Sequence, residues 1–564
     1  MSYKEIFEFH LNEYLKSTNY NKKIGVSYSD FDDFQYQTSI GLVLKKENKE
    51  FNPEEIKKFL EKNYQSFYEN ISVTGPGFIS VKFNLLNIKN EPAKPKKVII
   101  DYCGVNVAKQ MHIGHIRSMF IGDYIVRLHE KKGDNVTIFN HIGDWGNQFG
   151  YLLNYILENK LEKDLTNKNL TQYYKEATLL NKESVDFANK SAEIAYKLQN
   201  KTDKDLVKLW EKLVNISMIE ADKTFKEFNL KMSLDHTQGE SFYAPLCKDV
   251  LSELLNKQIA QKSEDGSVVC FFEKKSPLVL QKSNGNFLYA LYDLAAIKWR
   301  AENVNPDKIV YVVDKRQALH FEQVFEIAKK ANFIKPEVEL LHVGFGTILG
   351  ADKKPIKTKE GDSLYLDDLL SEGKEKLLKT EYFQKLNENL QEPVMMKNII
   401  GGMKYHDLKF NKTQDYVFDW NHVLNFSGGS APYIQNAMVR IDSIFEKLGL
   451  NMNMENSLDL DKNWNEMEKK IIFQCQKTEE VINFSENDYT SQAICENIIK
   501  ICQLFHSYYE QEYIIGHKEE AKKLELLNYI YSSLDKFTDV LGIESYPCQQ
   551  KMLKSLDKNN KLKF

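Results

Sequence analysis

A histidine-containing turn between a buried strand and a helix constrains the fold of this 564-residue chain more than any other feature. The apolar run at 98–100 predicts a buried strand, and residues 113–128 carry apolar side chains at helical spacing. His112 and His115 therefore stand at the start of the helix, where unpaired N–H groups and the helix dipole favour phosphate. Gly114 allows a flat ring or a phosphate to approach the backbone closely. Taken alone, this HxGH pattern also fits a helix start with two incidental histidines.

The order of predicted elements around this turn indicates an α/β fold. Strand patterns at 98–102 and 135–139 flank the helix, and a second strand–helix–strand pattern begins at 309–313. Such alternation is typical of a doubly wound, Rossmann-type parallel sheet, here split by an insertion at about 151–285. A chain of this length needs several cores. We predict three domains: an N-terminal α/β module, a catalytic domain that contains the insertion, and a C-terminal all-α bundle, at 1–95, 96–420 and 421–564.

The composition narrows the class of protein. No apolar run approaches the ~18 residues of a membrane span, and the first residues lack the apolar core of a signal peptide. The seven cysteines form no CxxC pair, which favours reduced thiols over disulfides or a zinc site. We therefore expect a cytoplasmic protein with no membrane partner and no protein metal site. With a net charge of −4, any nucleic acid must be bound by local basic patches.

Three further segments are expected beside the histidine turn, because the carboxyl ends of parallel strands meet at one edge. They are a polar segment at 140–148, an Asp-Lys-Arg-Gln segment at 314–317, and a glycine-bounded turn at 344–350 that suits an adenine ring. The lysine-rich stretch at 353–362 follows that turn. It is either an exposed charged turn or a loop whose lysines stabilise negative charge on phosphate, and its position after the glycine turn favours the loop.

Acids and amides at or near the predicted strand ends suggest a site for a planar cation. Carboxylates recognise a guanidinium through paired, charge-assisted hydrogen bonds. Each acid taken singly is equally consistent with a surface carboxylate. The residues in question are Asp101, Glu240, Asp293 and Gln317.

These segments, in this order, resemble the arginyl-tRNA synthetases of class I over about residues 30–548. HIGH alone would fit any class I synthetase or a related nucleotidyltransferase. The stretches that carry the resemblance are VTGPGF (73–78), NVAKQMHIGHIRS (106–118), NHIGDWGNQFG (140–150), GES (239–241), YALYDLAA (289–296), VVDKRQ (312–317), HVGFGTILGADKKPIKTKEGD (342–362), KYHDLKFNKTQDYVFDW (404–420) and SAPYIQNAMVR (430–440).

The resemblance implies an arginine–tRNA ligase that forms arginyl-adenylate from arginine and ATP and then charges tRNA(Arg). It implies ATP with Mg²⁺ as cofactor, and the expected oligomeric state is a monomer. The implied ATP-binding residues are Gly114, His112, His115, Gly344, Phe345 and Gly346. The implied arginine-binding residues are Asp101, Asn106, Glu240, Tyr289, Asp293 and Gln317.

Two departures from the family pattern affect the remaining residues. The KMSKS-like loop carries Lys357 and Lys359 without the full motif, and the family often compensates with a lysine before HIGH, here Lys109. Which of the three lysines contributes most stays open. The N-terminal module, expected on the tRNA D-loop side, reads Phe-Gln-Tyr-Gln where the family has GDYQ. Tyr36 and Gln37 in that motif are expected to bind tRNA, as is Tyr433 in the helical domain.

Two alternatives remain at this level. One is a tRNA-binding paralogue without catalysis, which the intact His112, His115, Asp293 and Gln317 argue against. The other is a class I ligase for another amino acid, such as glutamine or cysteine. The acid pair and the lack of a zinc-type cysteine cluster disfavour it.

Overall fold

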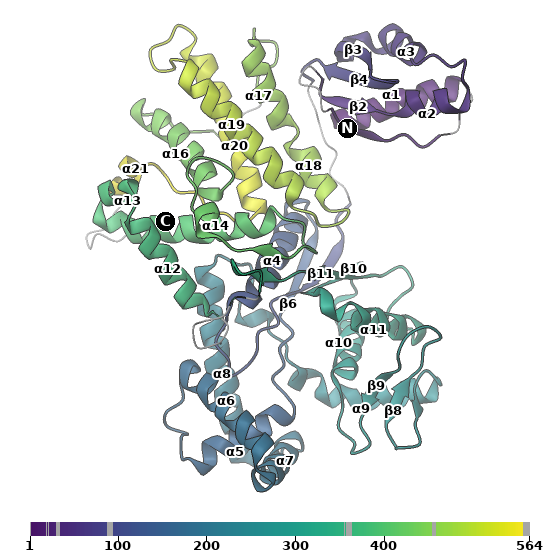
Figure 1. Cartoon of the computed structure of the whole chain (residues 1–564), viewed down its shortest axis with the longest axis vertical. Coiled ribbons are helices and arrows are strands. Elements are labelled where there is room, and N and C mark those ends of the chain that lie inside the picture. Colours follow the sequence, from purple (N-terminus) through teal and green to yellow (C-terminus); the bar gives the residue numbers. More distant parts are fainter. Residues whose placement is uncertain are drawn as a thin grey trace.

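The computed structural model describes residues 2–18, 20, 22–29, 34–86, 94–354, 356, 364–453 and 458–555. It contains the predicted α/β module, parallel sheet and helical C-terminal region. The α/β module lies beside the helical C-terminal region, and the parallel sheet lies below them in the view of Figure 1. Within the described residues, no helix is both long enough and apolar enough to cross a membrane.

The N-terminal module is an antiparallel sheet covered by helices. Its strands are β1 (Val26–Tyr28), β2 (Tyr36–Thr38), β3 (Tyr68–Thr74) and β4 (Phe78–Phe83), in the order β1-β2-β4-β3. Its helices are α1 (Tyr3–Ser17), α2 (Ile40–Glu47) and α3 (Glu54–Tyr64). A Gly-Pro-Gly turn joins β3 to the antiparallel β4, and its Gly75 and Gly77 adopt positive φ. This module has a hydrophobic core of its own, joined by Phe473 from the C-terminal bundle.

The central sheet is parallel, as predicted. Its order is β11-β10-β5-β6, built from β5 (Lys97–Asp101), β6 (Asn135–Phe139), β10 (Lys308–Asp314) and β11 (Glu339–Phe345). Two halves of the chain meet where β5 pairs with β10, which is the usual ligand-binding place in such sheets. The register sets Asp101 beside Tyr311 and Asp314 beside Phe345, so these strand ends share one edge.

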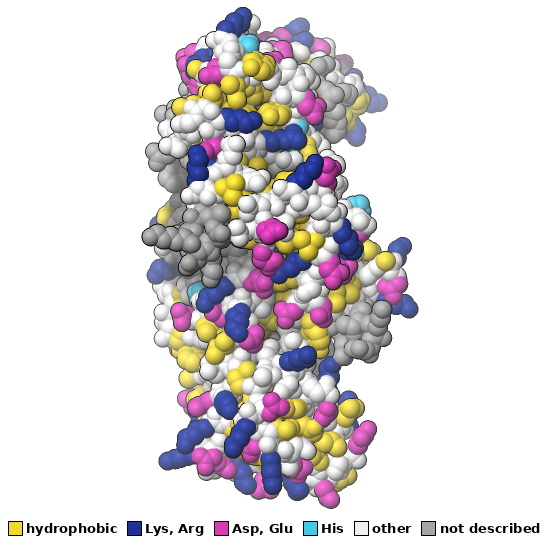
Figure 2. Space-filling model, turned by 90° about the vertical axis from the view of Figure 1, so that its left-hand side faces the viewer, with side chains coloured by type: hydrophobic (Ala, Val, Ile, Leu, Met, Phe, Trp, Pro, Cys, Tyr) yellow, Lys and Arg dark blue, Asp and Glu magenta, His cyan; other side chains and the backbone are white. Residues whose placement is uncertain are grey.

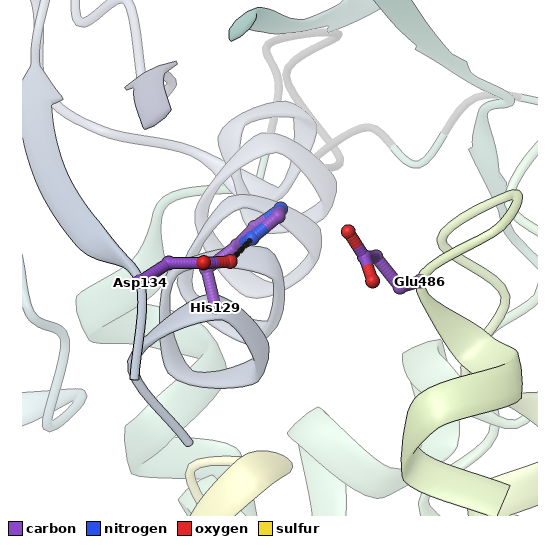
Figure 3. Close-up of side chains that lie close together, drawn as sticks. All are labelled: His129, Asp134 and Glu486. Carbon is purple, nitrogen blue, oxygen red and sulfur yellow. Dashed lines mark hydrogen bonds and ion pairs between the residues drawn. The ribbon is translucent and has the colours of Figure 1, made fainter. Parts of the chain in front are cut away.

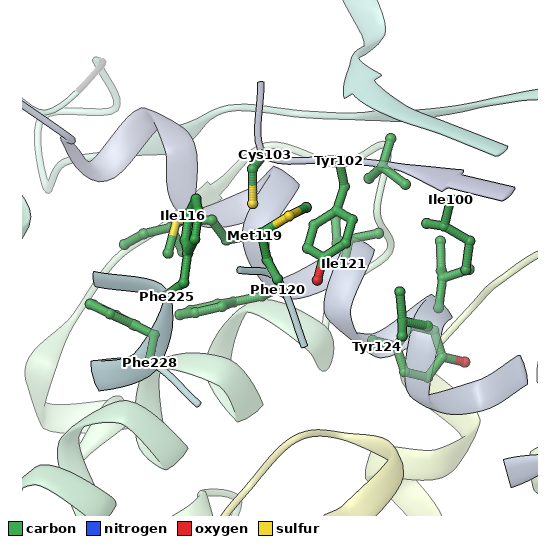
Figure 4. Packing of buried hydrophobic residues seen from close by; sticks show 14 of the residues in the cluster. Ile100, Tyr102, Cys103, Ile116, Met119, Phe120, Ile121, Tyr124, Phe225 and Phe228 are labelled. Atoms are coloured by element: carbon green, nitrogen blue, oxygen red, sulfur yellow. The ribbon is translucent and has the colours of Figure 1, made fainter. Parts of the chain in front are cut away.

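The helix after the histidine turn lies at the centre of the molecule. A 3₁₀ turn (Ile113–His115) leads into α4 (Ile116–Lys131), which is buried along most of its length. Figure 4 shows Met119 and Phe120 packed between Tyr102, at the end of β5, and Phe225 of a neighbouring helix. A Cβ on Gly122 would lie 2.3 Å from the Tyr102 ring, so close packing of α4 on β5 requires glycine there.

The insertion forms two lobes at one end of the molecule (Figure 1). The first is helical: α5 (Asn147–Glu158), α6 (Asn167–Glu183), α7 (Val185–Gln199) and α8 (Lys204–Glu227). The second surrounds a small antiparallel sheet: α9 (Glu240–Asn256), β7 (Gln261–Lys262), β8 (Val268–Cys270), β9 (Leu278–Gln281) and α10 (Tyr289–Val304). Helix α11 (Ala318–Lys330) then connects β10 to β11.

The part of the chain after β11 is mainly helical. Strand β12 (Ile348–Leu349) pairs in parallel with β13 (Tyr416–Val417). Helices α12 (Leu366–Leu378), α13 (Glu381–Lys385) and α14 (Glu388–Leu408) lie between these strands in sequence, and α15 (Trp420–Val423) follows β13. The bundle follows: α16 (Ala431–Lys447), α17 (Glu466–Gln476), α18 (Thr478–Ser485), α19 (Gln492–Gln511), α20 (Glu520–Val540) and α21 (Gln549–Lys554). One hydrophobic core runs through the parallel sheet and this bundle, which joins them into one packed unit.

The surface agrees with the small net charge. On the face drawn in Figure 2, Lys and Arg side chains alternate with Asp and Glu and do not merge into one broad basic area. A nucleic acid bound at this face would be met by separate lysines.

Candidate active site

One cavity of about 580 Å³ at the carboxyl edge of the parallel sheet contains most of the predicted ATP and arginine residues. It opens where β5 and β10 end, beside the start of α4. The predicted residues that line it are Asp101, Gly114, His115, Glu240, Tyr289, Asp293, Gln317 and Phe345. Segments separated by more than two hundred residues in sequence therefore meet in one concave site.

The two histidines present N–H donors from the first turn of α4. His112 Nδ1 accepts a hydrogen bond from the Gly114 N–H at 3.0 Å, and His115 Nδ1 accepts one from the His112 N–H at 3.1 Å. With Nδ1 as acceptor, each neutral ring carries its proton on Nε2. Burial lowers the pKa of His115 to about 4 and also lowers that of His112, with Lys109 adding to both effects. Both rings therefore act as neutral donors at neutral pH.

The acid pair, Glu240 and Asp293, lines the same cavity. Glu240 begins α9 and is 6% exposed, and burial followed by the charges of Asp293 and Asp144 raises its pKa to about 8. Asp293 Oδ2 lies 2.6 Å from His320 Nε2. Two carboxyl groups thus face a cavity in which a bound cation would relieve their repulsion.

Asp144 holds Glu240 in place, which the sequence did not indicate. Its carboxylate accepts hydrogen bonds from the Ser241 N–H at 2.9 Å and from the Ser241 hydroxyl. A Cβ on Gly239 would lie 2.3 Å from this carboxylate. The polar segment at 140–148 therefore contributes by fixing the start of α9 as well as by lining the cavity.

Asp101 differs from the other predicted arginine residues. Its Oδ2 lies 2.7 Å from Arg300 Nη1, and both side chains are buried. The charge of Asp101 is thus balanced from inside the protein although the residue also lines the cavity, and its role in arginine binding stays a prediction. Sequence reasoning missed this pair because Arg300 lies on α10, far from Asp101 along the chain.

Asn106 and Lys109 lie outside this cavity, in adjoining ones. Asn106 is exposed and lines a neighbouring cavity of about 350 Å³, although its backbone forms a bridge with Gly143 of the main cavity. Lys109 lines that cavity and a third one of about 500 Å³, which also contains His112. Its Nζ is 4.3 Å from the centre of the Tyr174 ring, and burial lowers the pKa of Lys109.

The predicted adenine turn is the end of β11 and the link to β12. Phe345 lines the main cavity, and Gly344 packs against the backbone of Lys315. The Gly346 N–H donates to the Lys412 carbonyl oxygen at 2.9 Å. The segment at 412–416 thus supports the turn from behind, a contact the sequence did not predict. Lys357 and Lys359 lie outside the described residues.

The three residues predicted to bind tRNA differ in their exposure and in their contacts. Tyr36 is fully buried, and its hydroxyl donates to Glu480 of α18, so the expected direct contact of Tyr36 with tRNA is wrong for this structure. Gln37 is partly exposed on β2. Tyr433, at the start of α16, packs against His506 with ring centres 4.7 Å apart.

A cluster of possible metal ligands occurs near the C-terminal end of α4. Figure 3 shows Glu486 facing His129 and Asp134 from the bundle. The His129 Nδ1 lies 2.7 Å from Asp134 and its Nε2 lies 2.8 Å from the Tyr489 hydroxyl, while Glu486 pairs with Lys132. Because both ring nitrogens and the carboxylate have these partners, the cluster joins the catalytic region to the bundle.

Comparison with known proteins agrees with this architecture. Residues 80–420 match the family described as tRNA synthetases class I (R), catalytic domain, and residues 434–547 match the DALR anticodon binding domain. The arginine--tRNA ligase of Pseudoalteromonas translucida is 34% identical over 547 residues, covering 91% of this chain and 93% of the relative. The arginine--tRNA ligase of Idiomarina loihiensis is 33% identical over 549 residues, covering 92% of this chain and 93% of the relative.

Solved structures show the same fold. The arginyl-tRNA synthetase of Plasmodium falciparum superposes with a TM-score of 0.80 at 28% identity, covering 96% of this chain and 98% of that one. The Thermus thermophilus enzyme shares the fold with a TM-score of 0.77 at 19% identity, covering 96% and 99%. Sheet, histidine turn and family matches together define a class I aminoacyl-tRNA synthetase. Within that class the chain belongs to the arginyl-tRNA synthetases, the ATP-dependent arginine–tRNA ligases.

Proposed function

We propose that the cavity at the end of β5 and β10 is where this enzyme joins arginine to ATP. The observation that carries this assignment is the placement of the histidine turn, Phe345 and the Glu240–Asp293 pair around one cavity. The carboxylate of arginine attacks the α-phosphate of ATP, which yields arginyl-adenylate and pyrophosphate. The 2′-OH of the terminal adenosine of tRNA(Arg) then attacks the carbonyl carbon of arginyl-adenylate, the acyl–phosphate bond breaks, and AMP leaves. The alternative of a silent paralogue finds no support in this intact site.

Arginine lies with its guanidinium against the acid pair in this proposal. Glu240 and Asp293 supply charged acceptors, while Tyr289 and Gln317 line the same cavity. Asn106 holds the amino or carboxylate end, and its bridge to Gly143 keeps it at the edge of the cavity. Asp101 has a positioning role here, because Arg300 already occupies its carboxylate.

ATP lies between the histidine turn and the end of β11. The Nε2–H groups of His112 and His115 donate to phosphate, and the backbone of 344–346 together with Phe345 receives the adenine. Mg²⁺ bound together with ATP would neutralise part of the phosphate charge. Catalysis then consists of positioning and of electrostatic stabilisation of the phosphate, and Lys109, Lys357 and Lys359 share that second role.

The tRNA meets three parts of the chain in this proposal. A cavity of about 760 Å³ between α7 and the start of α10 shares Glu240 and Tyr289 with the arginine site and receives the single-stranded 3′ end. Tyr196 and Tyr289 are about two-thirds exposed there, beside Lys201, as suits stacking on splayed bases. Tyr433 in the region 421–564 contacts the anticodon side, and the module at 1–95 reaches the D-loop side through Gln37. The catalytic region is 96–420, and the enzyme acts in the cytoplasm as a monomer.

The assay that tests this proposal is ATP–pyrophosphate exchange with each amino acid in turn, with and without tRNA(Arg). We expect exchange with arginine and a requirement for tRNA, followed by charging of tRNA(Arg). Exchange driven by glutamine or cysteine would refute the assignment of the acid pair to a guanidinium. Tight tRNA(Arg) binding without any exchange would instead point to the catalytically silent alternative.

A further inference from the structure

The segment at 412–416 contacts both halves of the proposed ATP site from outside the cavity. On one side, Asp415 Oδ1 accepts a hydrogen bond from the Thr347 N–H at 2.8 Å and lies 2.9 Å from Lys315 Nζ. Lys315 Nζ also donates to the Thr413 carbonyl at 3.1 Å. The turn that ends β11 and the segment after β10 are therefore tied together by one carboxylate.

The other side of the same segment contacts the histidine helix. Arg117, in the first turn of α4, donates from Nη1 to the Gln414 carbonyl at 2.7 Å. Its Nε lies 3.0 Å from Asp407 Oδ1, and both charged side chains are almost completely buried. The Arg117 guanidinium also lies over the Tyr416 ring, 5.1 Å from its centre. A buried ion pair with several further contacts holds its elements in one arrangement, because separating the charges is costly.

The close fit at Gly346 makes the spacing of this contact specific. A Cβ at that position would lie 2.5 Å from Asp415 Oδ1 and 2.7 Å from the Gln414 carbonyl. The parallel pairing of β12 with β13 continues the contact in the next residues. The turn therefore rests directly on the segment, and any displacement of the segment must move the turn.

We propose that residues 412–416 form a brace that sets the distance between the adenine turn and the histidine turn. Asp415 and Arg117 are its positioning residues, on the turn side and on the helix side respectively. Neither lines the cavity of the proposed site, so each would act through the backbone it holds. This inference rests on the proposed binding of ATP at 344–346.

The direct test is to measure the KM values for ATP and arginine in tRNA charging by Asp415→Ala, Asp415→Asn and Arg117→Lys. Loss of the hydrogen bond from Thr347 is expected to raise the ATP KM of Asp415→Ala about tenfold. Asp415→Asn keeps an acceptor and should stay within about threefold of the wild type. Arg117→Lys keeps the charge beside Asp407 but loses the forked contact, so its ATP KM should also rise.

The arginine KM and the unfolding temperature distinguish positioning from a general loss of structure. Asp415 is 42% exposed at its side chain, so its variants should unfold near the wild-type temperature with an unchanged arginine KM. Asp368→Ala, which removes an exposed carboxylate on α12, is the matched control and should alter neither KM. Equal rises in both KM values, or no rise for Asp415→Ala, would overturn the brace.

Phe345→Ala separates this inference from the proposed function. If that variant raises the ATP KM while Asp415→Ala does not, ATP binds at the turn but the brace is refuted. If neither variant changes the ATP KM, the proposed ATP site is wrong and the brace falls with it. Elevated ATP KM values for both, with wild-type arginine KM for Asp415→Ala, would support both.

Discussion

Glu240 is expected to make arginine binding depend on pH. Its carboxyl group is 6% exposed, and burial together with Asp293 and Asp144 raises its pKa to about 8. At pH 7, one unit below that value, only about one carboxyl group in eleven is ionised. The guanidinium of arginine stays charged throughout and binds the ionised form. Binding at pH 7 must therefore expel a proton from Glu240, at a cost of roughly 1.4 kcal/mol.

The size of the effect follows from the same pKa. Relative to the fully ionised site, the dissociation constant for arginine is about elevenfold higher at pH 7 and about twofold higher at pH 8. The affinity for arginine should therefore improve about fivefold from pH 7 to pH 8. Isothermal titration calorimetry in two buffers of different ionisation enthalpy should show release of nearly one proton per arginine at pH 7. Glu240→Gln should bind arginine more weakly and lose the pH dependence.

Thermal unfolding gives an independent check with a defined sign. Because folding raises the pKa of Glu240 from 4.5 to about 8, its stabilising contribution is present below pH 4.5 and is lost as pH rises towards 8. The difference in unfolding temperature, Glu240→Gln minus wild type, should therefore increase as the pH rises from 4.5 to 8. Asp249→Asn, an exposed carboxylate on the same helix, should show no such gain. A wild-type dissociation constant that stays flat from pH 6.5 to 8 would refute the reasoning.

Three further changes probe separate regions. Asp293→Asn should lower kcat/KM for arginine by ~10²-fold, because the guanidinium loses a charged partner, and unchanged arginine kinetics would exclude that role. Gly542→Ala should destabilise the protein by about 1–3 kcal/mol in denaturant unfolding, since φ is +65° and the new Cβ would lie 2.8 Å from Lys404 Nζ. An unfolding midpoint equal to the wild type would contradict that packing. Tyr433→Ala should raise the KM for tRNA several-fold and leave the arginine KM alone, whereas a rise in the arginine KM would place Tyr433 elsewhere.

The sequence determined the elements and their order. The apolar runs that became β5 and β10 are nearly continuous because strands buried on both faces of a parallel sheet have no polar side. The placement of His112 and His115 at a helix start could also be predicted from local sequence, because it depends only on the periodicity of the residues that follow. Predictions from such local patterns hold in the folded protein when the secondary-structure propensity and the burial of a segment favour the same element.

Tertiary structure decided which polar groups are free to act. Asp101 and Asp293 look alike in sequence and both line the cavity, yet the first pairs with the buried Arg300 and the second with the partly exposed His320. Tyr36 belongs to a motif expected to bind tRNA, yet its hydroxyl donates a hydrogen bond to Glu480, 444 residues away. Partners this far apart meet only through the packing of whole domains. A buried charge must find a partner wherever that packing supplies one, and no local pattern records which partner it will be.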